Sequence, residues 1–220
     1  MKRLIVIEGI DGCGKQTQTA MLYDAFVKMG YKTFKMSFPN YDSPSSAPIK
    51  MYLGGEFGDA NSLDAYQASV LFAADRICTI KQLQKTLDEY DIVIFDRYVT
   101  ANMLHQAGKI VDQKQKEKFL DWVNDLEFNL LKLPKPTDVI FLNLHYETSL
   151  KLINERANLK SGTTKDVLES DVDYLKNSYN TAELCINKFG WKTIDCNADN
   201  FGLKTREQIH NLIKETLNLK

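Results

Sequence analysis

The chain has 220 residues, 44% of them apolar and 26% charged, with a formal net charge of −1 at pH 7. This length and composition fit one globular domain with a full hydrophobic core, and the balanced charge, without a long basic run, argues against a nucleic-acid partner. No apolar run approaches the roughly 20 residues that cross a membrane, and the first charged residues lead straight into an apolar stretch, so we expect neither a membrane partner nor a signal peptide.

Apolar runs of strand length alternate with helical patterns along the chain, without internal repeats or a linker. Such alternation forms a parallel sheet covered on both faces, so we predict a three-layer α/β fold with a five-stranded sheet, in a single domain over residues 1–220. In such sheets, ligands bind beyond the carboxyl ends of the strands. Strands are expected at 4–8, 32–38, 91–96, 138–143 and 191–195. Helices are expected at 19–29, within 45–90 with breaks at Gly54-Gly55 and Gly58, and at 98–108, 113–132, 147–158, 167–188 and 204–218.

The stretch between the first strand and the first helix has the spacing of a phosphate-binding loop. Gly9 and Gly14 are followed by Lys15, as in G-x-x-x-x-G-K. Glycines let backbone N–H groups curl around phosphate oxygens, the helix N-terminus adds partial positive charge, and the lysine reaches the outer phosphates. The alternative, a Gly-rich turn without a ligand, is disfavoured by the order of strand, loop and helix. The candidate phosphate-binding residues are Gly9, Ile10, Asp11, Gly12, Cys13, Gly14, Lys15, Gln16 and Thr17.

One position departs from this pattern. The residue after the lysine is normally Ser or Thr, whose hydroxyl holds Mg²⁺, and here it is Gln16. Thr17 follows one residue late and is expected to point elsewhere on the helix, so the loop lacks the usual direct metal ligand. The side-chain carbonyl of Gln16 can still accept a hydrogen bond from a metal-bound water.

The third predicted strand ends in Asp96, Arg97 and Tyr98. An acid at this place can bind the magnesium ion of a nucleotide, directly or through water, and a guanidinium beside it can clamp a phosphate. The alternative is an Asp-Arg pair that caps the next helix. Because the pair follows a phosphate-binding loop in the same sheet, we favour the metal and phosphate roles.

Phe72 and Arg76 are four residues apart and therefore share one helix face. A ring beside a planar donor can stack on a nucleobase and donate hydrogen bonds to its edge. The alternative is a core phenylalanine with a surface arginine paired to an acid, and spacing alone favours that alternative.

The cysteines, Cys13, Cys78, Cys185 and Cys196, are scattered, with no pair at metal-ligand spacing. Reduced thiols of this kind predict a cytoplasmic protein. Cys13 is interpreted as a small residue that fits the loop rather than as a reactive thiol.

Four stretches together resemble the thymidylate kinase family, whose members phosphorylate dTMP with ATP. They are Gly9 to Lys15, Phe38-Pro39-Asn40-Tyr41, Leu71 to Arg76 and Asp96-Arg97-Tyr98, in that order and at fitting separations. The resemblance spans nearly the whole chain, because Glu155-Arg156 and 166–171 are similar to the lid of that family and the helix after it. It implies ATP and dTMP as partners, Mg²⁺ as cofactor, and a homodimer.

The resemblance also implies roles for individual residues. Lys15 and the loop amides would hold the β- and γ-phosphates of ATP, and Arg97 would bind the dTMP phosphate. Asp11 is similar to an acid near the sugar 3′-hydroxyl, and Asp96 would help to bind Mg²⁺. A lid over about 155–166 would close over the phosphates with one or more basic residues, among them Arg156, Lys160 and Lys165.

For the acceptor nucleotide, the resemblance implies that Phe72 stacks on thymine and that Arg76 donates to a base carbonyl. His105 stands where the family often has a tyrosine that crowds a ribose 2′-hydroxyl, and Asn40 stands where many relatives carry an arginine, so Arg97 would bear more of the phosphate charge. The other implied substrate-binding residues are Phe38, Pro39, Tyr41, Asn102, His105 and Gln106. The apolar positions Phe119, Trp122, Leu126 and Leu130 are expected to form core and, in part, a dimer interface.

Other functions remain open at this point. A kinase for another deoxynucleotide is the nearest, and a deoxynucleoside kinase would need a general base, for which Glu8 is the candidate. A GTP-binding switch lacks its Asn-Lys-x-Asp motif, since Asn187-Lys188 is not followed by the acid. A nucleotide-binding pseudoenzyme, suggested by Gln16, would bind ATP without turnover.

Overall fold

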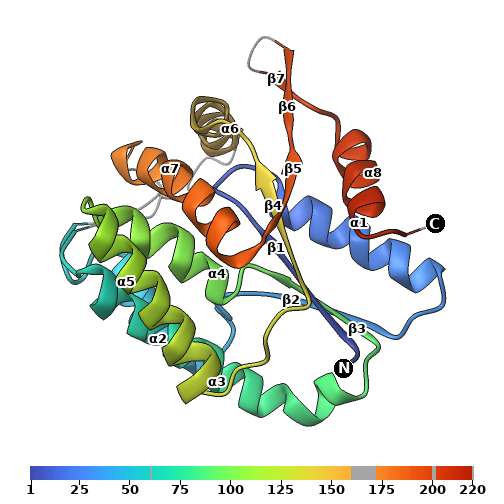
Figure 1. Cartoon of the computed structure of the whole chain (residues 1–220), viewed down its shortest axis with the longest axis horizontal. Coiled ribbons are helices and arrows are strands. Elements are labelled where there is room, and N and C mark those ends of the chain that lie inside the picture. Colours follow the sequence, from blue (N-terminus) through green and yellow to red (C-terminus); the bar gives the residue numbers. More distant parts are fainter. Residues whose placement is uncertain (60, 160–171, 200–201, 220) are drawn as a thin grey trace.

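A five-stranded parallel sheet forms the centre of the computed structural model (Figure 1). The structure describes all residues except 60, 160–171, 200–201 and 220, and for 156–159 it describes the backbone without the side chains. The strand order is β2-β3-β1-β4-β5. The predicted three-layer parallel architecture is confirmed, and each strand lies where the sequence predicts it. The strands are β1 Arg3–Glu8, β2 Thr33–Ser37, β3 Ile92–Asp96, β4 Asp138–Asn143 and β5 Lys192–Asp195.

Helices cover both faces of this sheet, as Figure 1 shows. One face packs against α1 Lys15–Lys28 and α8 Arg206–Thr216. The other packs against α3 Ala65–Asp88, α5 Gln113–Asn124 and α7 Val172–Phe189. The remaining helical segments are η1 Pro44–Ser46, α2 Ala47–Leu53, α4 Val99–Ala101, the π-helical turn η2 Asn102–Gln106, η3 Ala107–Lys109, the π-helical turn η4 Asp125–Leu130 and α6 Tyr146–Leu159.

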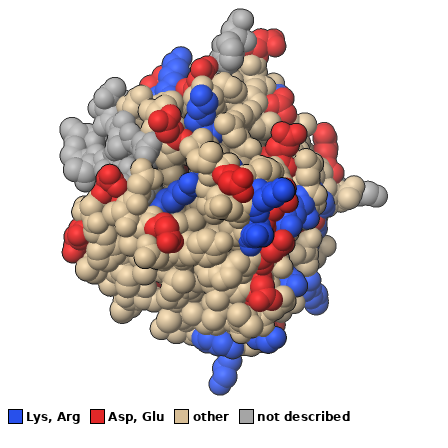
Figure 2. All heavy atoms as spheres, turned by 60° about the vertical axis from the view of Figure 1, so that its left-hand side comes forward, with Lys and Arg blue, Asp and Glu red and all other residues tan. Residues whose placement is uncertain are grey.

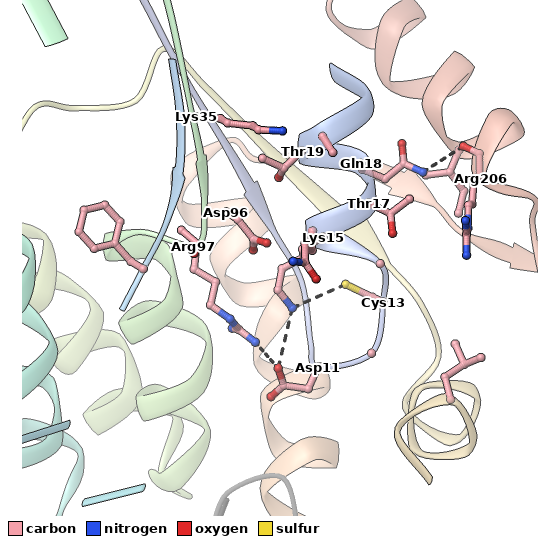
Figure 3. A pocket seen from close by; sticks show the side chains of 18 of the residues that line it. Asp11, Cys13, Lys15, Thr17, Gln18, Thr19, Lys35, Asp96, Arg97 and Arg206 are labelled. Atoms are coloured by element: carbon pink, nitrogen blue, oxygen red, sulfur yellow. Dashed lines mark hydrogen bonds and ion pairs between the residues drawn. The ribbon is translucent and has the colours of Figure 1, made fainter. Parts of the chain in front are cut away.

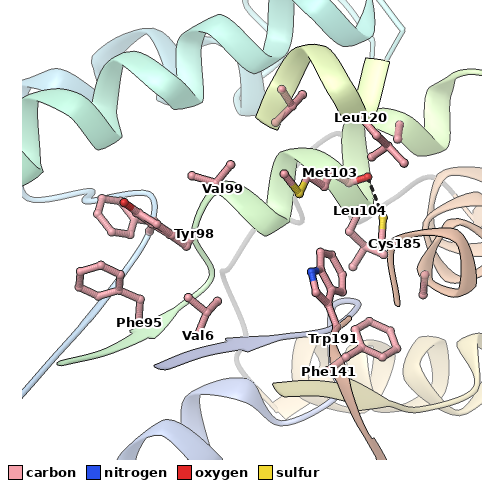
Figure 4. Close-up of a cluster of buried hydrophobic side chains, with 14 of the residues drawn as sticks. Val6, Phe95, Tyr98, Val99, Met103, Leu104, Leu120, Phe141, Cys185 and Trp191 are labelled. Atoms are coloured by element: carbon pink, nitrogen blue, oxygen red, sulfur yellow. Dashed lines mark hydrogen bonds between the residues drawn. The ribbon is translucent and has the colours of Figure 1, made fainter. Parts of the chain in front are cut away.

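Two hydrophobic clusters, one on each face, hold the layers together. Strand side chains alternate in direction, so Leu4 and Val6 join one cluster while Ile5 and Ile7 join the other. Figure 4 shows the first cluster, in which side chains of β1 and β3 meet those of the η2 segment and α7. Each side chain of this size contributes about 1.5–3 kcal/mol when fully buried.

The register of the sheet brings the chemistry-bearing strand ends together. Asp96 of β3 pairs in register with Ile7 of β1 and with Ser37 of β2. The loop after β1 and the Asp96-Arg97 pair after β3 therefore leave the sheet at the same edge. This adjacency positions the site.

Two differences from the expected elements affect the loop cleft. Helix α1 begins at Lys15 rather than at residue 19, because Gly14 in the left-handed region (φ 91°) ends the loop at that point. A small antiparallel hairpin, β6 Asn197–Ala198 and β7 Gly202–Leu203, follows β5. Strands of two residues carry no periodic signal, so the sequence did not predict it. Among the described helices, none combines the length and the apolarity needed to span a bilayer.

Candidate active site

Two adjoining cavities lie at the carboxyl edge of the sheet. The loop cleft, of about 780 Å³, follows residues 11–20 along the loop and the start of α1. The aromatic pocket, of about 160 Å³, lies beside it between α3, the η2 segment and α7. The residues that line both cavities are Asp11, Phe38, Pro39, Tyr41 and Arg97. The two cavities therefore meet at Asp11 and Arg97.

The loop has the backbone geometry of an anion site. Gly9 has φ 153°, and a Cβ at this position would lie 2.6 Å from Cys13 Sγ and 2.9 Å from the Leu142 carbonyl oxygen. Gly14 precedes α1 and offers no side-chain cap, so the N–H groups of the first helical turn remain for a ligand. The predicted loop residues 11–17 line the loop cleft, whereas Gly9 and Ile10 do not line it.

Lys15 is folded back onto this loop. Its Nζ donates to the carbonyl oxygens of Gly9 and Ile10, both at 2.9 Å, and lies 3.9 Å from the Asp11 carboxylate. Figure 3 shows Lys15, Asp11 and Arg97 pointing toward one another. An arriving phosphate can replace these two carbonyl oxygens as the hydrogen-bond acceptor of Lys15 Nζ.

Arg97 leaves β3 with a left-handed backbone (φ 64°), which is uncommon for a residue with a side chain and often occurs at functional sites. Its guanidinium forms an ion pair with Asp11, approaches Glu8 at 3.6 Å and donates to His105 Nε2 at 2.6 Å. Burial lowers the pKa of Arg97, but the carboxylates of Asp11 and Glu8 outweigh burial and the net shift is upward. The arginine is therefore charged and aimed at the junction of the cavities.

Asp96 lines the loop cleft close to Lys15 and Arg97 (Figure 3). Burial raises the pKa of its carboxyl, and the two cations partly offset this rise. Within the described part of the chain, no three His, Cys, Asp or Glu side chains are arranged so that they could hold a metal ion by themselves. The Asp96 carboxylate, with Gln16 exposed on the same cleft, fits Mg²⁺ that arrives on phosphates and keeps its waters rather than a closed protein site.

The aromatic pocket contains every residue predicted to bind the acceptor nucleotide. Phe72 is half-buried there, and Arg76 is only 2% exposed, so the alternative of a surface arginine is wrong. Arg76 instead makes a bidentate pair with the fully buried Glu127, at 2.5 and 2.7 Å, and donates to the Tyr98 carbonyl oxygen at 3.2 Å. Glu127 also accepts from Asn102 Nδ2 at 2.9 Å.

Sequence reasoning missed Glu127, although a signal was present. It stands four residues after Val123 and eight after Phe119, both fully buried, so it falls on the apolar face of that helical stretch. An acid on such a face needs a buried cationic partner. Tyr174 of α7, which lines the aromatic pocket and stacks on His105 with ring centroids 5.8 Å apart, had no comparable signal.

The far end of the loop cleft is built from segments without a sequence motif. Leu203 and Lys204 from the β6–β7 hairpin region and Arg206 at the start of α8 line it, opposite the junction with the aromatic pocket. Gln18 Nε2 donates to the Arg206 carbonyl oxygen at 3.0 Å and fastens α8 to α1. Thr17 lies on the same side of the cleft as Arg206 (Figure 3).

Two other departures noted in the sequence have structural outcomes. Asn40 lines neither cavity, and its Nδ2 donates to Thr79 Oγ1 at 3.3 Å. Asn40 therefore does not assist Arg97 in binding a phosphate. Cys13 is buried, which raises the pKa of its thiol and agrees with a packing role. The lid predicted over 155–166, including the Arg156 side chain, lies for the most part outside the described residues.

The site combines a strand, a glycine-rich loop with its lysine, and a helix N-terminus on a parallel sheet. An acid and an arginine end the neighbouring strand. Together these features define a P-loop phosphotransferase. A family model described as thymidylate kinase matches residues 7–199 of the chain. The chain belongs to the thymidylate kinase family.

Individual relatives agree with this assignment. Thymidylate kinase of Mycobacterium tuberculosis is 33% identical over 198 residues, which cover 89% of this chain and 92% of that protein. A probable thymidylate kinase of Methanococcus aeolicus is 30% identical over 221 residues, covering 100% of this chain and 98% of the relative. The structure of thymidylate kinase from Candida albicans matches with a TM-score of 0.70 at 22% identity, covering 99% and 91% of the two chains, and shows the shared fold.

Proposed function

We propose that this chain transfers the γ-phosphoryl group of ATP to the phosphate of dTMP and so forms dTDP. The observation that carries the proposal is the meeting of the two cavities at Arg97, with Lys15 on the loop side and Asp11 between the two cations. A donor in the loop cleft and an acceptor in the aromatic pocket would present their phosphates to each other at this junction. Family membership supports the reaction class.

In this reaction the acceptor phosphate is itself the nucleophile, so the protein has to position and neutralise charge rather than remove a proton. Lys15 and the first amides of α1 would bind the donor phosphates, and Arg97 would exchange Asp11 for the acceptor phosphate. Mg²⁺ on the donor would supply further charge neutralisation, and Asp96 with Gln16 would hold its waters. Arg156 of the lid would add positive charge as transfer proceeds.

The aromatic pocket offers the complement of a thymine edge. Arg76 uses three of its five N–H groups on Glu127 and Tyr98, which leaves two that can donate to a base carbonyl. The Gln106 Oε1 atom is buried without a hydrogen-bond partner, and Gln106 lines the pocket, so this oxygen can accept from the base N3–H. Phe72 would stack on the ring, and Phe38, Pro39, Tyr41 and Asn102 would complete the walls.

Homodimer formation is part of the proposal. Tyr66 and Val70 of α3 are 41% and 50% exposed, and Leu130 is 67% exposed. Trp122 packs edge-on against Tyr66, with ring centroids 4.7 Å apart. Figure 2, in which the left-hand helices of Figure 1 come forward, shows a broad area without charged side chains. A second copy would cover such a face.

We also propose a cytoplasmic location and a single domain. The four cysteines are free thiols, and Cys13, Cys185 and Cys196 are buried, which suits a reducing compartment. One continuous five-stranded sheet supports a single domain.

Two of the alternatives find little support in the site. Glu8, the candidate base for a deoxynucleoside kinase, is fully buried, accepts from the Gly9 amide and Thr100 Oγ1, and lines neither cavity. The pseudoenzyme rests on Gln16 alone, while Asp96 and Lys15 are both in place.

The decisive experiment measures ADP release with ATP and Mg²⁺, comparing dTMP, dUMP, dGMP, UMP and thymidine as acceptors. Turnover strongest with dTMP supports the proposal, and turnover strongest with another acceptor overturns the base pocket built on Phe72 and Arg76. ATP binding without turnover on any acceptor favours the pseudoenzyme. Lys15→Ala should abolish turnover, whereas the matched change of an exposed lysine that lines neither cavity, Lys85→Ala, should leave it unchanged.

A further inference from the structure

His105 connects the arginine at the junction of the cavities to helix α7. Its Nε2 lies 2.6 Å from Arg97 NH1, and its Nδ1 lies 3.2 Å from Ser178 Oγ in the middle of α7. The sequence interpretation placed His105 beside the sugar only. The structure gives the same ring a second set of contacts, which the phosphoryl-transfer chemistry described above does not use.

The protonation of this histidine follows from its partners. A guanidinium can only donate, so Nε2 must be the acceptor and carries no proton. The ring proton then lies on Nδ1 and is directed at Ser178 Oγ. Burial, aided by the nearby Arg97 charge, lowers the pKa of His105 to about 3, so the ring is neutral at physiological pH.

The position of the ring is strongly constrained. His105 is 5% exposed and stacks on Tyr174 with 15° between the ring planes, and Ser178 is fully buried. The α7 backbone also packs tightly on the η3 segment, since a Cβ at Gly108 would lie 3.1 Å from the Ser178 amide nitrogen. The imidazole is therefore a fixed support rather than a mobile side chain.

The neutral His105 imidazole can accept a hydrogen bond from Arg97 without reducing the positive charge of the guanidinium. Asp11 and Glu8 lie against the Arg97 guanidinium and Asp96 acts on it as well, so a further carboxylate would offset more of the charge that a phosphate needs. An imidazole holds NH1 by a hydrogen bond without adding negative charge. The left-handed backbone at Arg97 does not by itself aim the long side chain, and this hydrogen bond gives NH1 a support outside the loop.

We propose that His105 is a positioning residue, which holds Arg97 NH1 in the orientation that receives the acceptor phosphate and takes its own orientation from Ser178 of α7. This inference rests on the proposed function, because it assumes that Arg97 binds the acceptor phosphate. It assigns His105 to phosphate recognition, in addition to the wall that it forms beside the nucleoside. It also ties the phosphate-binding arginine to the helix that follows the predicted lid in sequence.

The test compares dissociation constants of dTMP and thymidine, which differ only in the phosphate, measured by titration calorimetry. His105→Phe keeps the ring against Tyr174 but removes both nitrogens. We expect dTMP affinity to fall about tenfold, as for a lost hydrogen bond to a charged group, while thymidine affinity stays within about twofold. His105→Gln, whose amide can reach the Nε2 position, should restore most of the dTMP affinity. Ser178→Ala should give a smaller selective loss.

The matched control is His210→Phe on α8, a histidine that lines neither cavity; it should change neither affinity. Unchanged dTMP binding by His105→Phe overturns the positioning role. Equal losses for dTMP and thymidine also overturn it, because they would assign His105 to the nucleoside wall alone. Failure of the unaltered protein to bind dTMP would instead overturn the proposed function, so the two failures are distinguishable.

Discussion

The two arginines of the site, Arg76 and Arg97, are held in opposite ways. Arg76 is 2% exposed, and its main partner, Glu127, is fully buried, so the pair is sealed on the wall of the aromatic pocket. Arg97 lies where the cavities meet, and Asp11, its ion-pair partner, lines both of them. One pair is permanent and the other can be exchanged for a ligand.

This difference indicates a division of labour. A bidentate pair removed from water has a fixed geometry and no net charge, so Arg76 can present N–H groups of defined direction to a neutral base. Arg97 retains a positive charge, and a phosphate dianion can replace the Asp11 carboxylate as its ion-pair partner. The predictions below test whether the two arginines separate in this way, from the largest expected effect to the smallest.

Removal of Arg97 should affect chemistry far more than stability. In Arg97→Ala we expect kcat to fall by about a thousandfold or more, because charge at the transferred phosphoryl group loses its preorganised partner. Arg97→Lys should recover only part of this loss, since an ammonium lacks the planar fork. Steady-state kinetics measures the effect, with circular dichroism as the check on folding. Near-normal turnover by Arg97→Ala would remove the arginine from the mechanism.

Breaking the buried pair should affect stability first. Glu127→Ala leaves the Arg76 charge buried and without its carboxylate, which should cost about 3–5 kcal/mol of unfolding free energy in urea denaturation. The apolar double variant Arg76→Met with Glu127→Leu should recover most of that stability while dTMP binding stays weak. A loss below about 1 kcal/mol in Glu127→Ala would contradict the sealed character of the pair.

His105 should make the protein sensitive to acid. Its pKa is lowered from 6.5 to about 3 in the folded state, so the unfolded chain binds the proton more readily between these values. Stability from this group is therefore complete above pH 6.5 and is lost as the pH falls toward 3. At pH 5.5 the loss should be about 1.4 kcal/mol relative to pH 8.

The measurement for this prediction is urea unfolding at pH 8 and pH 5.5 for the unaltered protein and for His105→Gln. Other groups titrate equally in both proteins, so the difference between their pH slopes isolates His105. Identical slopes would show that burial and the Arg97 charge do not hold the imidazole neutral.

The smallest effect is expected at Gly108. A Cβ there would lie 3.1–3.3 Å from backbone atoms of Asn177 and Ser178, so Gly108→Ala should push α7 outward. We expect a loss of about 1 kcal/mol, after the entropic gain of the substitution is counted. If Arg76 and Arg97 act independently, the KM for dTMP should rise severalfold while thymidine binding through Arg76 stays unchanged. Weakened thymidine binding would show that the two arginines are not independent.

The overall fold could be predicted because its signals are local. Buried parallel strands read as short apolar runs, and Gly9, Gly14 and Lys15 mark the loop by spacing alone. The boundary at Lys15 and the two-residue strands of the hairpin were missed, because a helix start set by one glycine and a pairing of two residues leave no periodic pattern. The predicted substrate-binding residues came from the resemblance, and the structure brings them to one pocket.

The sequence by itself determined the sheet, the loop and the residue types that meet phosphate, since these depend on neighbours along the chain. Only the tertiary structure decided that Arg76 is sealed by Glu127, 51 residues away, and that His105 reaches Ser178 and Arg97 together. Spacing alone had favoured a surface Arg76, because a single sequence does not show which distant acid will share its burial. The protonation state of His105 depends on such a contact as well. Long-range packing determines solvent access, and solvent access determines which charges remain available to a ligand.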